Sequence, residues 1–130
     1  MTITYKITSK QDFIEKIEIY DDIIANMRSG IQIIFGEYGT GKTSLVNCIE
    51  TEFNLNLLKF DSSTKRSPKY IGECINDFIS NKTMDKEKGI FYDEFEYVIG
   101  ENIGATSIIN HMKRKNVPVF ICVHIQFLAR

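Results

Sequence analysis

One stretch constrains the fold of this chain more than any other: Gly36-Glu37-Tyr38-Gly39-Thr40-Gly41-Lys42-Thr43. It matches the pattern G-x-x-x-x-G-K-[ST] at every defined position. An apolar run at residues 31–35 precedes it, as expected of a buried strand, and residues 44–50 follow with apolar side chains at helical spacing. A strand, a glycine-rich loop and a helix in this order predict a phosphate-binding loop. The alternative is a glycine turn before a helix that happens to start with Lys-Thr, and the flanking strand and helix favour the phosphate-binding loop over it.

The chemistry of phosphate binding accounts for the residue types of this loop. Glycine has no Cβ, so the backbone can turn inward and approach phosphate oxygens closely. Successive backbone N–H groups and the positive end of the following helix then face the anion. Lys42 is expected to reach the β- and γ-phosphates, and the Thr43 hydroxyl to ligate Mg²⁺. The predicted nucleotide contacts are Gly36, Glu37, Tyr38, Gly39, Thr40, Gly41, Lys42, Thr43 and Ser44.

Strands and helices alternate along the rest of the chain. Apolar runs predict strands at 55–60, 89–94 and 117–123, and helical spacing predicts helices at 42–53, 69–81 and 105–115. Residues 81–88 and 99–104 are expected to be loops. Residues 1–10 are β-rich and polar, so they predict an edge strand or an extended arm, and apolar positions at helical spacing predict one or two helical pieces at 11–27. The chain's 130 residues suffice for one domain with a real core. We therefore expect an α/β fold, a three-layer P-loop NTPase with a mostly parallel sheet covered by helices on both faces.

Polar side chains are expected to gather at one edge of this sheet. The glycine-rich loop, Asp61, Asp93-Glu94 and His124 all follow predicted strands directly. Ligands of open parallel sheets bind beyond the carboxyl ends of the strands. The sequence therefore predicts that these groups share one site.

The segment Ile90-Phe91-Tyr92-Asp93-Glu94 has the form of a Walker B element, a hydrophobic strand followed by two acids. Asp93 is expected to hold Mg²⁺, and Glu94 to orient and deprotonate an attacking water. The alternative is a strand that leaves the core into an acidic turn, since Glu96 is nearby. Adjacent Asp and Glu favour ATP hydrolysis over a GTPase or a small-molecule kinase. The stretch at 81–85 is similar to the guanine-reading N-K-x-D but has one residue too many, and we interpret it as surface.

Composition narrows the functional class further. The formal net charge of −1 gives no overall field that attracts nucleic acid, so DNA contact would need local patches. Two basic clusters exist, and each is either solvated surface or a contact to a phosphate backbone: Lys65, Arg66 and Lys69; Lys113, Arg114 and Lys115. The three cysteines fit reduced thiols, and the two histidines complete no metal-ligand spacing. We expect a soluble, intracellular protein with no membrane partner.

The ordered motifs resemble those of AAA+ ATPases, and among them clamp loaders, in particular the large subunit of replication factor C. The Walker A loop and Asp93-Glu94 carry the family resemblance. Three stretches are similar to the clamp-loader subunit: residues 59–67, residues 93–96 with 100–102, and residues 108–122. The family usually has Pro-Pro where Glu37-Tyr38 stand, and its sensor-1 Asn where His124 stands.

The resemblance implies an AAA+-type nucleotide-binding domain over residues 1–130, which we expect to lack the C-terminal helical lid. It implies ATP and Mg²⁺ as cofactors, and Glu94, Lys42 and His124 as catalytic residues. Expected partners are other clamp-loader-like subunits, a sliding clamp and DNA, in the nucleus or another site of DNA replication. Because such ATPases take an arginine finger from a neighbouring subunit, turnover is expected to depend on partners. Two alternatives stay open: an ATP-binding interaction module without hydrolysis, and another P-loop ATPase that acts on DNA.

Overall fold

Six-residue segments rich in apolar side chains form the strands of one sheet. In the computed structural model, which describes residues 2–7, 17–37, 39–65, 67–81, 85–101, 104–114 and 116–124, five strands lie in the order β1-β2-β5-β4-β3. Every pairing between neighbouring strands is parallel. The strands are β1 (Thr2–Ile7), β2 (Ile31–Gly36), β3 (Leu55–Phe60), β4 (Glu87–Tyr92) and β5 (Val119–His124).

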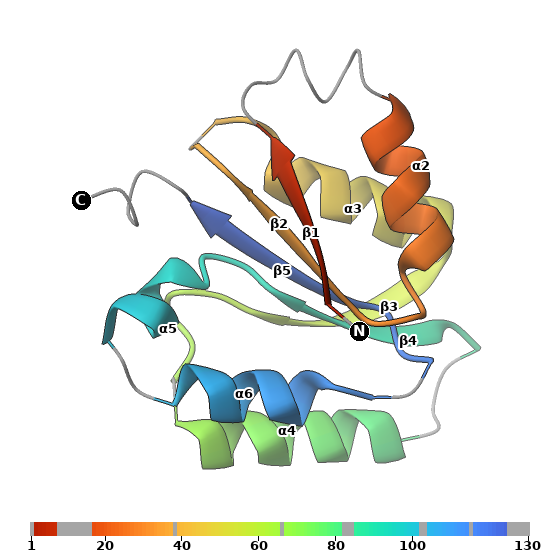
Figure 1. Cartoon of the computed structure of the whole chain (residues 1–130). Coiled ribbons are helices and arrows are strands. Elements are labelled where there is room, and N and C mark those ends of the chain that lie inside the picture. The colour runs from red at the N-terminus through yellow and green to blue at the C-terminus, as the bar shows by residue number, and fades with distance from the viewer. Residues whose placement is uncertain are drawn as a thin grey trace.

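Helices cover both faces of this sheet (Figure 1). On one face lie α2 (Ile17–Asn26) and α3 (Lys42–Glu52), and on the other lie α4 (Pro68–Ser80), α5 (Glu96–Glu101) and α6 (Ala105–Met112). Each face has its own apolar core, one around Ile34 and Leu45 and the other around Ile71 and Ile108. This arrangement confirms the predicted three-layer α/β fold. It also explains why β5 is an unbroken apolar run, since a strand covered on both faces has no solvent side.

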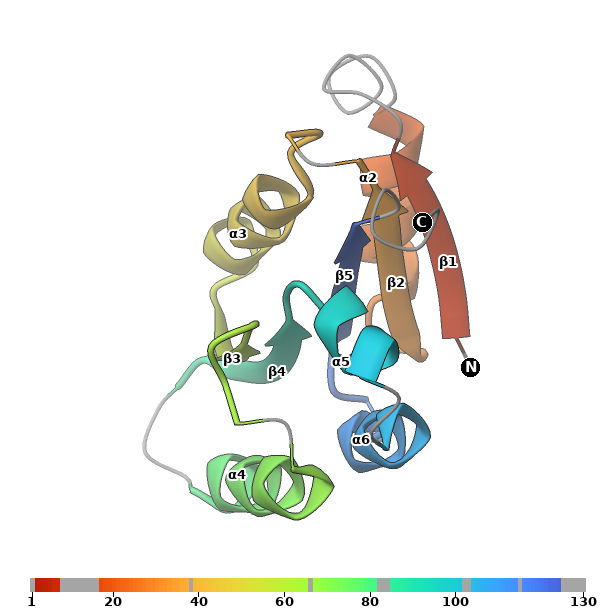
Figure 2. The same cartoon turned by 90° about the vertical axis from the view of Figure 1, so that its left-hand side faces the viewer.

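The strand order places the segments that carry polar residues next to one another. β5 lies between β2 and β4, and in its register with β2, Gly36 is paired with His124 (Figure 2). The chain leaves β2 into the glycine-rich loop and leaves β4 into Asp93 and Glu94. All three strand ends therefore meet at one carboxyl edge.

Several predicted boundaries were wrong, each for a local reason. Residues 99–101 are not a loop but the end of α5, because Phe95 and Val98, three residues apart, bury themselves under the sheet. The strand expected at 89–94 is shifted to Glu87–Tyr92, so the loop at 81–88 is shorter and the two acids lie beyond the strand. The helix expected to reach residue 115 ends at Met112, and the last strand begins at Val119 after Pro118. Of the one or two helical pieces expected at 11–27, the structure shows α2 from Ile17 to Asn26, and residues 11–16 lie outside the described residues.

The N-terminal segment forms an edge strand, one of the two conformations expected of it. β1 pairs along its whole length with β2, from Thr2 opposite Ile31 to Ile7 opposite Gly36. Within the described ranges, each helix is too short or too polar to cross a bilayer.

Candidate nucleotide-binding site

The glycine-rich loop joins β2 to α3 through backbone conformations that favour glycine. Gly39 has a φ of 77° and Gly41 a φ of 90°, and Gly41 is the residue that caps the start of α3. A side chain at either position would strain the left-handed backbone. The Gly41 carbonyl accepts the first hydrogen bond of the helix, from the Leu45 N–H at 2.9 Å. The sequence motif therefore corresponds here to a turn that directs the start of α3 toward the carboxyl edge of the sheet.

Lys42 is buried in this loop, with only 3% of its surface exposed. Its Nζ donates to the carbonyl oxygens of Gly36 and Glu37, at 3.0 and 2.5 Å, and to Thr40 Oγ1 at 3.0 Å. Burial lowers the pKa of the Lys42 ammonium, against the attraction of nearby groups that include Asp93. The loop thus closes around its own lysine, and a phosphate oxygen would take the place of these backbone and hydroxyl acceptors.

Thr43 and Asp93 are in direct contact although they are far apart in sequence. Thr43 Oγ1, in the first turn of α3, donates to Asp93 Oδ2 at 2.8 Å. The other carboxylate oxygen, Oδ1, accepts the Glu94 N–H at 2.9 Å, and the Asp93 N–H donates to the Phe60 carbonyl at 2.8 Å. These bonds fix Asp93 on two sides. A hydroxyl and a carboxylate oxygen side by side are ligands that Mg²⁺ prefers when phosphate oxygens complete its shell, so these residues fit the ion.

Glu94 is held by the turn that follows β3. Its Oε1 accepts hydrogen bonds from the Ser62 hydroxyl at 2.9 Å and the Ser62 N–H at 3.5 Å. The backbone of Glu94 is in the left-handed region, with a φ of 55°. Non-glycine residues adopt this conformation at a cost and are concentrated at functional sites. The predicted catalytic carboxylate is therefore placed by both its own backbone and a neighbouring strand end.

Asp61 supports the site rather than entering it. Its Oδ1 accepts from the Ser63 N–H at 2.9 Å and from the Ser63 hydroxyl at 2.6 Å, and these hydrogen bonds lower the pKa of the Asp61 carboxyl. The result is a tight polar turn that presents Ser62 to Glu94. The composition Asp-Ser-Ser-Thr is typical of such turns. Sequence reasoning missed Ser62, because the turn signal does not reveal a partner 32 positions away.

His124 and the glycine-rich loop line a common cavity of about 300 Å³. Its described lining is Gly39, Gly41, Lys42, Thr43, Ser44 and His124. His124 ends β5, and its imidazole contacts the carboxylate of Glu96, the first residue of α5. Of the predicted nucleotide contacts, Gly36 and Glu37 bind Lys42 through their carbonyls, and Tyr38 lies outside the described residues. The cavity thus brings together the loop and the end of β5, as the strand order requires.

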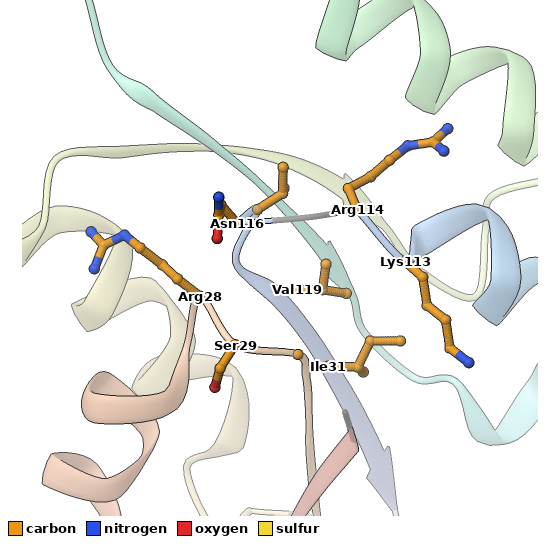
Figure 3. A pocket seen from close by; sticks show the side chains of 9 residues that line it. Arg28, Ser29, Ile31, Lys113, Arg114, Asn116 and Val119 are labelled. Carbon is orange, nitrogen blue, oxygen red and sulfur yellow. The ribbon is translucent and has the colours of Figure 1, made fainter.

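A second cavity, of about 350 Å³, lies at the opposite, amino edge of the strands (Figure 3). Arg28, Lys113 and Arg114 line it, but the charged ends of the two arginines point away from each other (Figure 3). Arg28 binds both carboxylate oxygens of Glu87, at 2.6 and 2.5 Å, and Arg114 Nη2 donates to Asn76 Oδ1 at 2.5 Å. Because these cations do not converge, the cavity at the glycine-rich loop is the better candidate for a phosphate group.

Comparison with known proteins identifies the family of this chain. The replication factor C large subunit of Methanococcus vannielii is 26% identical over 92 residues, which cover 68% of this chain and 19% of that protein. The chain thus spans about a fifth of the length of this relative. The model of the ATPase family associated with various cellular activities (AAA) matches residues 32–122, from β2 through the glycine-rich loop and the two acids to β5. The chain belongs to this AAA family of ATPases.

Proposed function

We propose that this chain binds ATP with Mg²⁺ in the cavity at the glycine-rich loop and hydrolyses it. The observation that supports this most directly is the contact between Thr43 and Asp93. It joins the first turn after the loop to the acidic turn after β4, beside the buried Lys42. The loop that would bind the phosphates thereby lies next to the carboxylate that would bind Mg²⁺.

Each group has a distinct role in this proposal. Backbone N–H groups of the loop and Lys42 bind the phosphates, with Lys42 exchanging its carbonyl partners for phosphate oxygens. Thr43 and Asp93 would hold Mg²⁺, which neutralises phosphate charge when bound. Glu94, held by Ser62, orients a water and accepts its proton. His124 contacts the end of the triphosphate from β5.

We further propose that residues 1–130 act as the nucleotide-binding domain of a clamp-loader-like complex in DNA replication. The likeness to a replication factor C large subunit supports this role. Other clamp-loader-like subunits, a sliding clamp and DNA are the proposed partners, at the site of DNA replication. Turnover would then depend on a neighbouring subunit for an arginine finger.

Two substitutions test the ATPase. Lys42→Ala should weaken ATP binding by at least about tenfold, because a charge-assisted hydrogen bond contributes roughly 1.5–3 kcal/mol. Glu94→Gln should keep ATP affinity and abolish phosphate release. Binding is measured by calorimetry and hydrolysis by phosphate release. Lys69→Ala and Glu73→Gln, at exposed positions of α4, are the matched controls.

A second function, ATP binding without hydrolysis, is favoured by one observation. The Ser62 hydroxyl donates a hydrogen bond to Oε1 of Glu94, so this oxygen is already bonded to the protein and competes less well for an attacking water. In that case the chain would be a nucleotide-dependent interaction module. Equal phosphate release from the wild type and Glu94→Gln would select this alternative, whereas unchanged ATP affinity in Lys42→Ala would contradict both functions.

A further inference from the structure

The carboxylate of Glu96 is fully buried and bound twice by His124. Glu96 Oε1 accepts the backbone N–H of His124 at 3.1 Å, and Oε2 lies 2.5 Å from His124 Nδ1. The Glu96 side chain is 0% exposed, and that of His124 is 12% exposed. A buried carboxylate is costly unless donors surround it, and here one residue supplies two of them.

This pairing determines how the imidazole is oriented. An ionised carboxylate only accepts hydrogen bonds, so the proton of the short contact belongs to Nδ1. Any contact of the ring with a ligand in the cavity must then be made through the other edge, which carries Nε2. The same logic applies where a buried carboxylate orients a catalytic histidine or a histidine that binds a metal.

The protein scaffold holds both partners of this pair in place. Glu96 begins α5, which lies at the carboxyl end of β5 (Figure 2). The Phe95 N–H donates to the Cys122 carbonyl at 3.0 Å, which ties the start of α5 to β5 two residues before His124. On the neighbouring strand β2, Gly36 is in register with His124, and the glycine-rich loop begins there. The imidazole is therefore held between α5 and the phosphate cavity.

We propose that Glu96 is a positioning residue that orients His124 to recognise the terminal phosphate of a nucleoside triphosphate. This inference rests on the proposed function. With Nδ1 donating to Glu96 and Nε2 donating to a phosphate oxygen, the ring is an imidazolium, in which both nitrogens are donors. The Glu96 carboxylate balances that charge. Lys42 from α3 lines the same cavity as His124, and Glu96, Asp93 and Glu37 are near enough to attract its ammonium.

The consequence is a preference for ATP over ADP that depends on both residues. Glu96→Gln keeps the shape of the side chain and an acceptor for the His124 N–H. Its amide, however, donates to Nδ1 and provides no compensating charge. We expect this substitution to lower the ratio of ATP to ADP affinity by roughly tenfold, the scale of one charge-assisted hydrogen bond. His124→Ala, which removes the donor, should lower the ratio as well, and adding Glu96→Gln to His124→Ala should change it no further.

A purely structural role for Glu96 predicts a different pattern. In that case Glu96→Gln would weaken ATP and ADP binding equally, and its effect would add to that of His124→Ala. Glu96→Asp, which restores a carboxylate, should recover part of the ATP preference. Affinities for ATP and ADP with Mg²⁺ are measured by calorimetry on all variants, with thermal unfolding to verify that each is folded.

The orientation of the ring can also be read without nucleotide. The chain has two histidines, so imidazole ¹⁵N resonances can be assigned with a single His111→Gln variant. We expect the proton of His124 on Nδ1 in the wild type and Glu96→Asp, and on Nε2 in Glu96→Gln, with His111 unchanged. Unchanged His124 resonances in Glu96→Gln would overturn the role proposed for Glu96 and leave the proposed function standing. An unchanged ratio of ATP to ADP affinity in a Glu96→Gln variant that binds ATP would do the same. A wild-type chain that binds no ATP would overturn the proposed function and the sensing role with it.

Discussion

Thr43 Oγ1 donates a hydrogen bond of 2.8 Å to Asp93 Oδ2, across 50 positions of sequence. The parallel order β2-β5-β4 creates this contact, because the chain leaves both β2 and β4 at the same edge. The fold thereby places a hydroxyl oxygen from the first turn of α3 beside a carboxylate oxygen from the turn after β4. If they hold Mg²⁺, a change at either should affect the metal and leave the rest of the fold intact.

The first prediction therefore concerns the Mg²⁺ dependence of ATP binding. Thr43→Ala and Asp93→Asn should each reduce the gain in ATP affinity that Mg²⁺ provides, because the first removes a ligand oxygen and the second removes the negative charge of the other ligand. The affinity for ATP is measured with Mg²⁺ and with EDTA, and the ratio is compared with that of the wild type. Thr51→Ala is the matched control, since Thr51 lies on the exposed side of α3 and its hydroxyl donates to the Asn47 carbonyl at 3.1 Å, away from the site. A wild-type ratio in both site variants would contradict this metal site.

A second prediction isolates backbone strain in the glycine-rich loop. Gly39 has a φ of 77°, yet a Cβ added there would meet nothing within 4 Å. Gly39→Ala should therefore lower the free energy of unfolding through backbone conformation alone, by about 1–2 kcal/mol. Gly39→Asn should cost less and Gly39→Val more, because Asn tolerates the left-handed region and a β-branched residue does not.

Denaturant unfolding of the three Gly39 variants tests this order. Gly72→Ala is the comparison, because its Cβ would lie 2.8 Å from the His111 ring and act by crowding. At position 72 a larger side chain should always lower the free energy of unfolding more. At position 39 the loss should instead follow how well the new residue tolerates a left-handed backbone. If Gly39→Asn were as destabilising as Gly39→Val, backbone strain would not explain the glycine.

Local signals in the sequence were sufficient for the central elements and insufficient at their ends. The motif at 36–43 and the apolar runs predicted β2, α3, β3 and the layered sheet, because hydrophobic periodicity depends on burial and both faces are covered. The start of α5 was missed, since a six-residue helix anchored by Phe95 and Val98 has too little periodicity to recognise.

The candidate site shows the same division. Lys42, Thr43, Asp93 and His124 could be proposed from motif and strand position, and the structure brings them to one edge. Sequence reasoning placed Glu96 in an acidic turn and in a stretch similar to the clamp-loader subunit, and it gave this residue no role. Its burial and its two bonds to His124 arise from the packing of α5 on β5, which no local pattern encodes. The roles of all these residues stay predictions.

A third prediction concerns acid stability. Hydrogen bonds from Ser63 lower the pKa of Asp61 below its ordinary value of 3.8. A carboxyl whose pKa is lowered by folding stabilises the protein above the unfolded pKa and loses that contribution as pH falls through the folded pKa. The stability attributable to Asp61 should therefore be complete above pH 3.8 and decline below it. Asp61→Asn should flatten the decline of the thermal midpoint below pH 4, modestly, because the side chain is exposed.

Ser63→Ala provides the companion variant to Asp61→Asn. It removes the hydroxyl that donates to Asp61 at 2.6 Å and keeps the backbone N–H at 2.9 Å. The decline of its thermal midpoint below pH 4 should therefore be intermediate between those of the wild type and Asp61→Asn. If the thermal midpoint of either variant fell more steeply below pH 4 than that of the wild type, the direction of the pKa shift of Asp61 would be contradicted.

The last prediction uses the enclosure of Lys42. Lys42 is 3% exposed as a residue, and Gly36, Glu37 and Thr40 hold its ammonium, so it should react with an acylating reagent far more slowly than an exposed lysine. Burial lowers the pKa of Lys42, which by itself would raise reactivity, so slow labelling would show that enclosure dominates. Lys69 and Lys113 serve as exposed references in one mass-spectrometric time course. Thr40→Val removes one of the three acceptors and should accelerate labelling of Lys42 alone. Labelling of Lys42 as fast as that of Lys69 would mean that the loop opens readily without a ligand.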